Sequence, residues 1–463
     1  MKNIKKLLSI VLALCLVLSF TACSKDSSKT SKGEDTTKNQ ESTKNNENKD
    51  QEVAKDIPEI TFYHGYFQDD WQPAVEMRKI YDDFAELHKD EFIFKPIAME
   101  TGGEGVYNKC TQEIAASKIP DIVDLAGYNV IPAASEADLI IDLKPYIDED
   151  ENFKNGIGVN IEQNNMDGKI YTVRDQLETM GFWYNEDLFN KAGADTPDKW
   201  KTWDDFAIAV EKLVDSSEVE TPFTLSQGWT TNILFTGLMM GSQDGRNMLA
   251  DNVKDFNNEA FKQALTFLKD NALDKVTSEY FVAGDSDKYR EDFFTGKAAM
   301  LFNGVWESGS FVGDNVTIDV NSIKPAVFPT YEDNQNAAIM SASPGYIIAK
   351  NQDKAKIDAC IEFVKYMTSQ EIADKIFTKV MAMPPSTVLD YKKLEHESEG
   401  DYVVSNLAFA CELAAHSKYQ IASLGVDWGQ DISDAIDGKY AGLKDGSKSI
   451  EDIVSELNQL LDE

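Results

Sequence analysis

The sequence predicts an α/β fold, and two observations support this prediction. From Pro58 onward, short segments with the period-two alternation of strands are separated by longer segments with the three- and four-residue spacing of helices. The chain also has 463 residues, of which 42% are hydrophobic, so it can build a large core and is long enough for two domains.

The first predicted domain alternates strand and helix. Residues 59–64 alternate along the chain as a strand does, and Pro73 is expected to open a helix with an apolar face. The next expected elements are a strand at 92–99, a helix at 108–117, which ends before Pro120, and a strand at 121–126. This order favours a mainly parallel sheet in the first domain.

A second region begins after residue 165, and two of its helices have clear boundary signals. Thr202 is the expected N-cap of one helix, because the carboxylate of Asp205 can complete a capping box. Gly296 is expected to end another helix at 289–295. The other expected elements are extended segments at 169–173, 181–184, 298–302 and 346–349, and helices at 258–270, at 354–367 and from 450 onward.

The first 22 residues have the features of a secretory signal peptide. Lysines precede an apolar segment at 7–20, which is shorter than the roughly 20 residues that span a membrane. The next residues, Phe20-Thr21-Ala22-Cys23, resemble a bacterial lipobox, although Phe20 replaces the usual aliphatic residue. This resemblance implies cleavage before Cys23 and a lipid on its sulfur. The alternative is an ordinary signal peptide that leaves Cys23 as a free thiol.

Residues 23–57 contain few apolar side chains, so we expect a disordered tether between the lipid and the fold. The net charge of −35 argues against nucleic acid as a partner and against a basic membrane-binding face. We expect a protein on the extracellular face of the bacterial membrane, held there only by its lipid anchor. We also expect it to be a monomer.

Motifs that indicate an enzyme or a metal site are missing from the sequence. The four histidines match no zinc-binding spacing, and the chain has no nucleophile elbow, phosphate-binding loop or complete calcium loop. Cys110, Cys360 and Cys411 form neither a disulfide framework nor a zinc pattern, although one disulfide among them stays open. We therefore expect no enzymatic activity, no metal and no cofactor.

Several segments, in order along the chain, resemble the motifs of one family. They are 118–123 (KIPDIV), 181–189 (GFWYNEDLF) with Thr202-Trp203 after it, 294–300 (FTGKAAM) with 303–306 (NGVW), 328–330 (FPT) and 345–350 (GYIIAK). Together they resemble the family 1 extracellular solute-binding proteins, the substrate-capturing lipoproteins of sugar ABC importers. The resemblance covers nearly the whole chain from Pro58.

The resemblance implies a two-lobed, periplasmic-binding-protein-like fold of type II, with a hinge between the lobes and interleaved chain crossings. Lobe I is expected to contain 58–165 and 330–375, and lobe II 166–329 and 376–463. The family also implies a carbohydrate ligand in the cleft between the lobes, closure of the lobes around it and delivery to the permease subunits of an ABC transporter.

The leading candidates for ligand binding are tryptophans, because an aromatic ring matches the C–H face of a sugar. Trp306 matches the G-x-W position of the family. Trp428 lies between glycines and resembles a late aromatic position of the family, with Asp427 as a possible acceptor for a sugar hydroxyl. For both tryptophans the alternative is a ring in the core of a lobe.

Further candidates carry more evenly balanced alternatives. One of the neighbours Trp183 and Tyr184 is expected to face the cleft while the other packs, and the sequence favours neither. Tyr128 follows the third strand, where a ring of lobe I usually reaches the cleft in the family. Trp229 lies in a glycine-containing loop, with a core ring as the alternative, and Gly345 would allow a close backbone approach or form a plain turn.

Tyr63 and His64 end the first strand and point to opposite faces, so at most one of them faces the cleft. His64 continues an apolar face and is equally consistent with a core histidine. Arg174, with Asp175, is placed to grip sugar hydroxyls, or else to form a surface ion pair. Two other functions stay open: the same fold binding a non-sugar solute or acting as a sensor, and an anchored carbohydrate-active enzyme.

Overall fold

The structure, a computed structural model, describes residues 57–461 other than 70, 126–129, 251–252, 276–280, 282–285, 332–333, 351–352, 388 and 399. The expected signal peptide at 1–22, Cys23 and, apart from Ile57, the expected tether at 23–57 lie outside the described residues. Each helix in the described part of the chain is too short or too polar to cross a membrane.

Two sheets organise the fold, and the smaller has four strands in the order β12-β3-β1-β2. Its strands are β1 (Glu59–His64), β2 (Ile93–Ala98), β3 (Ile122–Asp124) and β12 (Tyr346–Ile348). The pairing confirms a mainly parallel sheet, because β1 runs parallel to both β2 and β3, and β12 alone is antiparallel to its neighbour. We call this sheet and the helices packed on it lobe I.

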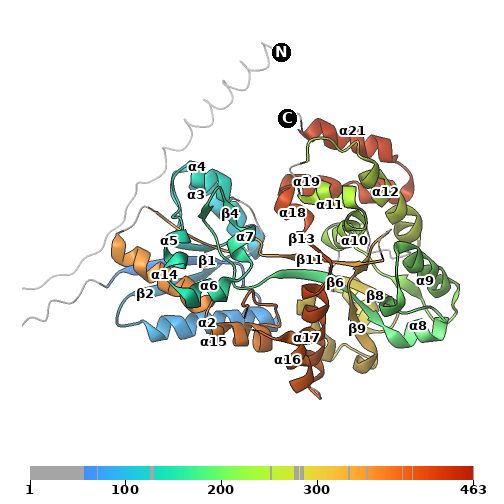
Figure 1. Cartoon of the computed structure of the whole chain (residues 1–463), viewed down its shortest axis with the longest axis horizontal. Helices are drawn as coiled ribbons and strands as arrows, with labels where there is room; N and C mark the ends of the chain where they lie inside the picture. The colour runs from blue at the N-terminus through green and yellow to red at the C-terminus, as the bar shows by residue number, and fades with distance from the viewer. Residues whose placement is uncertain are drawn as a thin grey trace, which may run out of the picture. The chain divides into compact units, whose positions relative to one another are not determined.

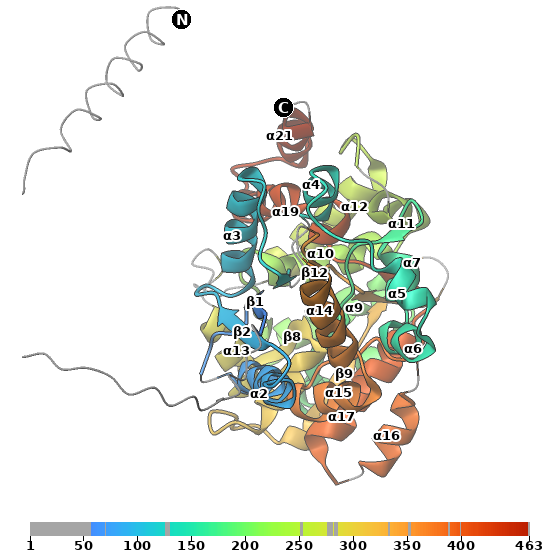
Figure 2. The ribbon, with the colours of Figure 1, turned by 90° about the vertical axis from the view of Figure 1, so that its left-hand side faces the viewer.

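Helices cover lobe I because each presents an apolar face to the sheet. Phe62 of β1 packs edge-on against Tyr81, at 5.0 Å between ring centroids, and its ring is tilted against that of Phe363 at 4.8 Å. Figure 2 views the molecule from the side of lobe I, whose helices α2, α3 and α14 surround the strands. The helices are α2 (Gln72–Leu87), α3 (Gly103–Ala115), α4 (Ile131–Glu136), α5 (Lys144–Asp148), α6 (Glu151–Ile157), α7 (Asn160–Gln163), α14 (Lys354–Met367), α15 (Gln370–Lys375) and η5 (Ile376–Val380).

The larger sheet has seven strands and forms lobe II with its helices. Its main path is β10-β11-β6-β8-β7, with β13 beside β11 and β9 beside β6. Most of its pairs are antiparallel, and β6 and β11 extend from lobe II toward lobe I (Figure 1). The strands are β6 (Glu178–Asn185), β7 (Thr221–Phe223), β8 (Ala298–Gly304), β9 (Ile323–Ala326), β10 (Phe328–Pro329), β11 (Asn336–Ser341) and β13 (Tyr419–Ile421); a separate hairpin joins β4 (Asn165–Met166) to β5 (Lys169–Ile170).

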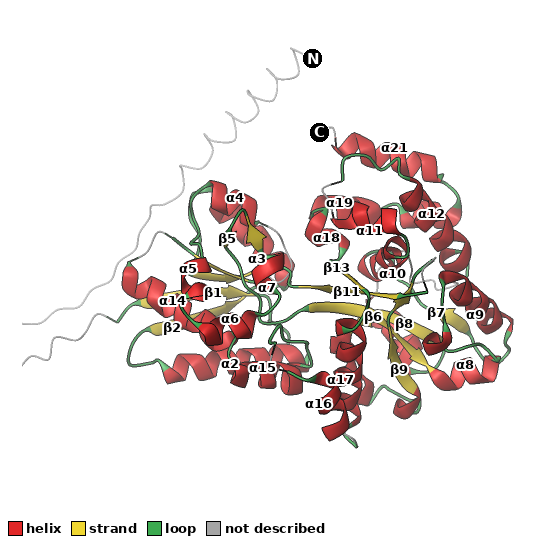
Figure 3. Ribbon diagram, viewed as in Figure 1, coloured by secondary structure: helices red, strands yellow, loops and turns green. Residues whose placement is uncertain are grey.

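Lobe II carries most of the helices, which flank its sheet (Figure 3). The capping box of Thr202 and Asp205 is confirmed at the start of α9, and α10 is buried on every side after Trp229. The elements are α8 (Glu186–Ala192), η1 (Pro197–Lys199), α9 (Trp203–Asp215), α10 (Trp229–Met240), α11 (Gln243–Ala250), α12 (Glu259–Leu268), η2 (Lys269–Leu273), α13 (Ser286–Phe294), η3 (Val305–Val312), η4 (Val320–Ser322), α16 (Tyr391–Glu397), α17 (Tyr402–Ala415), α18 (Leu424–Asp427), α19 (Gln430–Asp437), α20 (Tyr440–Asp445) and α21 (Ile450–Leu461).

Three chain crossings connect the lobes, and each lies later than the sequence predicted. Ile170 and Val173 pack in the core of lobe I, so the first crossing follows Val173 and not residue 165. β11 pairs with β6, which places 336–341 in lobe II and moves the second crossing from 330 to about 342–345. Val380 and Ala382 still pack in lobe I, so the third crossing lies near 381–383 and not at 375.

The physical reason for these corrections is that strand pairing and core contacts decide which lobe holds a segment, and neither is local in sequence. Two isolated β-bridges tie the crossings together: Val173 pairs with Tyr346, and Leu177 pairs with Met383. The complete residue-by-residue division into lobes remains a prediction. Cys110, Cys360 and Cys411 are buried free thiols, so the alternative of a disulfide among them is not supported.

Candidate functional site

A pocket of about 220 Å³ lies where the crossings meet the two lobes. Lobe I contributes the segment after β1 and the end of η5, and lobe II contributes η3. The crossing segments supply the remaining wall. The lining residues are Tyr66, Trp71, Pro73, Arg174, Gln176, Leu177, Glu178, Trp306, Ser343, Val380 and Ala382. The pocket therefore combines aromatic rings with charged and amide side chains.

The wall from lobe I is aromatic. Tyr66 and Trp71 follow β1, and their rings stack with centroids 6.3 Å apart and planes 19° apart. Trp71 is also the N-cap residue of α2, whose first turn contains Pro73, so the helix start fixes its backbone. The hydroxyl of Tyr66 accepts a hydrogen bond of 2.8 Å from Nε2 of Gln176, which ties this wall to the first crossing.

The wall from lobe II is Trp306, whose half-buried ring lies over Gly304. A Cβ atom at residue 304 would lie only 2.3 Å from the ring, so a side chain there would force the ring to move. Trp306 also lines a larger hollow of about 880 Å³, which shares Trp71 and Pro73 with the smaller pocket. The ring of Trp229, 42% exposed, lies 6.4 Å from that of Trp306.

Arg174, Gln176 and Glu178 line the pocket from the first crossing and the start of β6. Nη1 of Arg174 donates a 3.1 Å hydrogen bond to the carbonyl of Pro344 and lies 3.8 Å from Oδ1 of Asp124. Its Nε atom is buried and has no hydrogen-bond partner among the described residues. The alternative of a surface ion pair is therefore wrong: Arg174 is an interior cation beside the pocket.

Two acids close to Arg174 in the chain also have raised pKa values, and they differ in exposure: Asp175 is buried, whereas Glu178 is half-buried and lines the pocket. Asp175 is 3% exposed, and its Oδ2 accepts a 2.8 Å hydrogen bond from the hydroxyl of Tyr346. Burial raises the pKa of Asp175 to about 7, repulsion from Asp124 adds to this, and the charge of Arg174 opposes it. Burial also raises the pKa of Glu178, whose Oε2 accepts a 2.9 Å bond from Oγ of Ser423.

The structure corrects the expectation that Trp183 or Tyr184 faces the cleft. Trp183 is 1% exposed, donates its indole N–H to the carbonyl of Gly304 at 3.1 Å and packs edge-on against Phe311. Tyr184 is buried on the opposite face of β6 against Phe189. Neither ring lines the pocket, because β6 is a central strand with a packed core on each face.

Trp428 is also a core residue and not a pocket wall. It is 5% exposed, its indole N–H donates a 2.9 Å bond to the carbonyl of Met248, and its ring meets Phe256 nearly at right angles. Helices α11 and α12 cover this ring, although glycines flank Trp428 in the sequence. The side chain of its neighbour Asp427 lies outside the described residues, as does the whole of Tyr128.

The remaining candidates lie off the pocket wall. His64 is a core histidine: its Nδ1 accepts the N–H of Tyr66 at 3.3 Å, and burial lowers its pKa to about 4. Tyr63 is half-buried on the other face of β1, beside α3. Gly345 does allow a close backbone approach, but to another segment of the chain, because a Cβ atom there would lie 2.6 Å from the carbonyl oxygen of Val173.

Comparison with known proteins places the chain in a family. Residues 73–374 match the model of the bacterial extracellular solute-binding proteins. The chain belongs to this family. The resemblance expected from the sequence motifs is thus confirmed, and members of the family are binding proteins.

Relatives and solved structures cover most of the chain. An arabinooligosaccharide-binding protein of Bacillus subtilis is 24% identical over 384 residues, which are 81% of this chain and 79% of the relative. A solute-binding protein of Streptococcus pneumoniae, solved with the blood group A-trisaccharide, is 32% identical with a TM-score of 0.74, over 87% of this chain and 99% of that one. An ABC substrate-binding protein of Listeria monocytogenes, solved with cycloalternan, shares the fold at 20% identity, with a TM-score of 0.66 over 88% and 98% of the two chains. These structures confirm the predicted two-lobed α/β fold.

Sequence reasoning about this family member missed the wall from lobe I and two crossing residues. Tyr66 and Trp71 were not among the candidates, and neither were Gln176 and Glu178. One signal was present: an aromatic-rich segment directly follows a parallel strand, at the carboxyl edge where ligands bind in α/β sheets. Gln176 and Glu178 carried no local signal, because their position depends on where the chain crosses.

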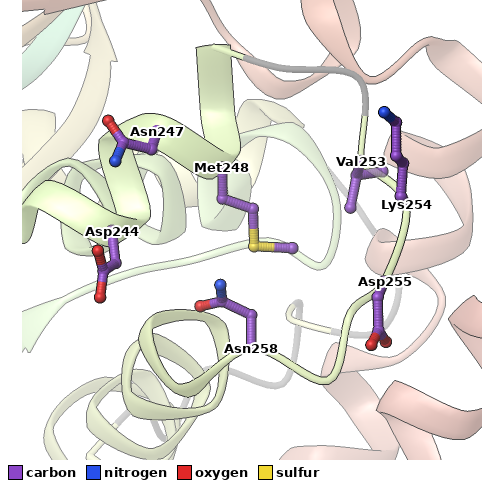
Figure 4. Close-up of a pocket in the computed structure, with 7 residues that line it drawn as sticks. All are labelled: Asp244, Asn247, Met248, Val253, Lys254, Asp255 and Asn258. Carbon is purple, nitrogen blue, oxygen red and sulfur yellow. The ribbon is translucent and has the colours of Figure 1, made fainter.

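A second hollow, of about 630 Å³, lies wholly within lobe II between α11 and the segment before α12 (Figure 4). Its polar groups form hydrogen bonds that stabilise the neighbouring chain segments. Oδ1 of Asp255 accepts bonds from the N–H of Asn257 and Nδ2 of Asn458, and Asn258 caps α12. Among the described residues, no three acids, histidines or cysteines are grouped to hold a metal ion. The pocket at the crossings is therefore the better candidate for ligand binding.

Proposed function

We propose that this protein is a receptor that binds a carbohydrate, most simply an oligosaccharide, between its lobes and delivers it to an ABC import permease. The observation that carries the proposal is the meeting of Trp71 and Trp306, from different lobes, in one pocket with polar side chains of the crossing. Rings of this kind match the C–H faces of a sugar, and Arg174, Gln176 and Glu178 match its hydroxyls.

The same arrangement accounts for closure of the lobes on the ligand. A ligand can favour a closed state only through contacts that differ between the open and closed states. A sugar held between Trp71 and Trp306 would contact both lobes at once, whereas the crossing residues would remain in contact with it in either state. The names of the relatives, which bind arabinooligosaccharide, maltodextrin or several sugars, support a carbohydrate ligand.

The proposal includes the location of the receptor. Cys23 would carry the lipid, 24–57 would form the tether, and the fold would act as a monomer on the extracellular face of the membrane. This arrangement keeps the receptor near its permease while its lobes remain free to move. Membrane fractionation tests the anchor: Cys23→Ala is expected to shift the protein into the soluble fraction.

A fluorescence titration tests the ligand class, because Trp71 and Trp306 would report a sugar in the pocket. Purified protein is titrated with arabino-, malto- and chito-oligosaccharides, and separately with polyamines and peptides. We expect a saturable change with at least one oligosaccharide and no new products on chromatography. A response only to the non-sugars would refute the carbohydrate ligand, and turnover of an oligosaccharide would instead support an anchored enzyme.

A further inference from the structure

A hydrogen-bonded network of polar side chains, centred on the buried Glu307, lies next to Trp306 in the chain, and no sequence motif had indicated it. Glu307 is 2% exposed, although it lies in a short 3₁₀ segment beside the pocket. Its Oε1 accepts bonds from Arg290, at 2.9 Å from Nε and 2.5 Å from Nη2, and its Oε2 accepts a bond from Nδ2 of Asn303. A carboxylate this deeply buried requires such partners.

The network holds the chain on both sides of Trp306. Before it, Oδ1 of Asn303 accepts the N–H of Gly304, the residue on which the ring lies. After it, Nη2 of Arg290 donates a 2.8 Å bond to Oγ of Ser310. Because a 3₁₀ segment has poorer backbone hydrogen bonds than an α-helix, these side-chain bonds supply much of its orientation.

We propose that Glu307 is a positioning residue, which holds the Trp306 ring in the orientation that forms the pocket wall. The effect of Glu307 on ligand binding rests on the proposed function. An apolar substitute would often support the fold as well as a buried ion pair does. Here the two hydrogen bonds from the Arg290 guanidinium converge on Oε1 and the bond from Asn303 reaches Oε2, so both carboxylate oxygens of Glu307 are held in direction. Glu307 itself does not line the pocket, so any effect it has on binding must pass through its neighbours.

A double-mutant cycle tests the coupling. Glu307→Gln preserves the shape of the side chain but removes its charge and one acceptor. We expect it to weaken oligosaccharide binding roughly tenfold in the wild-type background and to have no effect in the Trp306→Ala background. An equal loss in both backgrounds, or no loss in the wild-type background, would overturn the inference.

A ligand-free measurement separates this inference from the proposed function. Protein labelled with 5-fluorotryptophan gives one fluorine resonance for each tryptophan, and Trp306→Phe assigns the resonance of Trp306. Glu307→Gln is expected to shift or broaden that resonance and to leave the resonance of Trp428 unchanged. An unchanged Trp306 resonance overturns the inference, whereas a wild-type protein that binds no sugar overturns only the proposed function.

Two further variants complete the test. Arg290→Lys retains the positive charge but not the paired hydrogen bonds, so it is expected to change the Trp306 resonance in the same way if Glu307→Gln fails to fold. Glu456→Gln is the control for the loss of an ion-paired carboxylate away from the pocket: Glu456 lies on α21, is more exposed than Glu307, and is bonded to Lys439 and Lys448. It is expected to leave both binding and the Trp306 resonance unchanged, and a similar effect from it would count against a specific role for Glu307.

Discussion

Trp306 and Trp428 have similar sequence surroundings and opposite structural roles. Each has a glycine within two residues, yet the ring of Trp306 lines the pocket between the lobes and that of Trp428 lies in the core of lobe II. The indole N–H of Trp428 has an internal acceptor in the carbonyl of Met248, and Phe256 and Phe261 pack on its ring. The comparison shows that a nearby glycine in the sequence does not tell whether a ring is covered: Gly304 lies beneath the ring of Trp306, but elements far away in sequence decide the exposure of both rings.

The largest effect is expected from Trp428→Ala. Removal of a ring this deeply buried leaves a cavity, which costs about 3–5 kcal/mol in the free energy of unfolding. Urea denaturation measures this loss, and ligand affinity is expected to stay unchanged in the folded fraction. Trp428→Phe is the control, which retains an aromatic ring in the core but loses the bond to Met248 and part of the packing. A loss of affinity with normal stability would instead indicate that Trp428 is part of the binding site.

The opposite outcome is expected from Trp306→Ala. Loss of a central aromatic wall is expected to weaken sugar binding by about 2 kcal/mol, or roughly thirtyfold in Kd, because central aromatic residues dominate binding energy. The melting temperature is expected to change little, since the ring is half-buried. Fluorescence titration and thermal melting measure the two effects, and Trp306→Phe should retain part of the affinity. A large fall in melting temperature with unchanged affinity would mean that Trp306, like Trp428, is a core residue.

A smaller effect, per unit of pH, is expected at Asp175, a buried neighbour of the lining residues Arg174 and Gln176. Asp175 has a pKa of about 7 in the fold and about 3.9 in an unfolded chain. The folded state therefore binds more protons between these values, and this group makes the free energy of unfolding fall as the pH rises from about 4 to about 7.

Asp175→Asn removes that contribution and retains an acceptor for the hydroxyl of Tyr346. The variant is expected to gain stability relative to the wild type across this range, by up to about 1.4 kcal/mol per pH unit. His64, with a lowered pKa, has the opposite pH dependence, but it is present in both proteins and cancels in the difference. Urea denaturation at several pH values measures the difference, and a constant offset would mean that Asp175 is ionised throughout.

The strands and helices of this protein were largely predictable because their signals are local. The strand at 59–64, the helix at 354–367 and the capping box at Thr202 appear in the structure where the sequence placed them. The helix expected at 108–117 begins earlier, at Gly103. Gly102, with a positive φ of 66°, is its N-cap residue, and the first turn has no periodic apolar residues that could have indicated it.

The candidate site was less predictable, because side-chain exposure depends on partners far away in sequence. Alternation along β6 correctly separated Trp183 from Tyr184, but it did not reveal that cores cover both faces of this strand. In the same way, Arg174 and Asp175 look like a surface pair in a chain of net charge −35, yet at the crossing Asp175 is buried and Arg174 is half-buried beside Asp124.

The sequence by itself determined the α/β class, the order of the main elements and, through its motifs, membership of the solute-binding family. It could do so because periodicity, caps and motifs depend on neighbours a few residues apart. Only the tertiary structure decided where the chain crosses and which rings line the pocket. Trp428 and its acceptor Met248 are 180 residues apart, and Tyr66 and its partner Gln176 are 110 apart. Such pairs form only when the whole chain has folded, so they decide which rings are covered and which line the pocket, and they leave no local pattern.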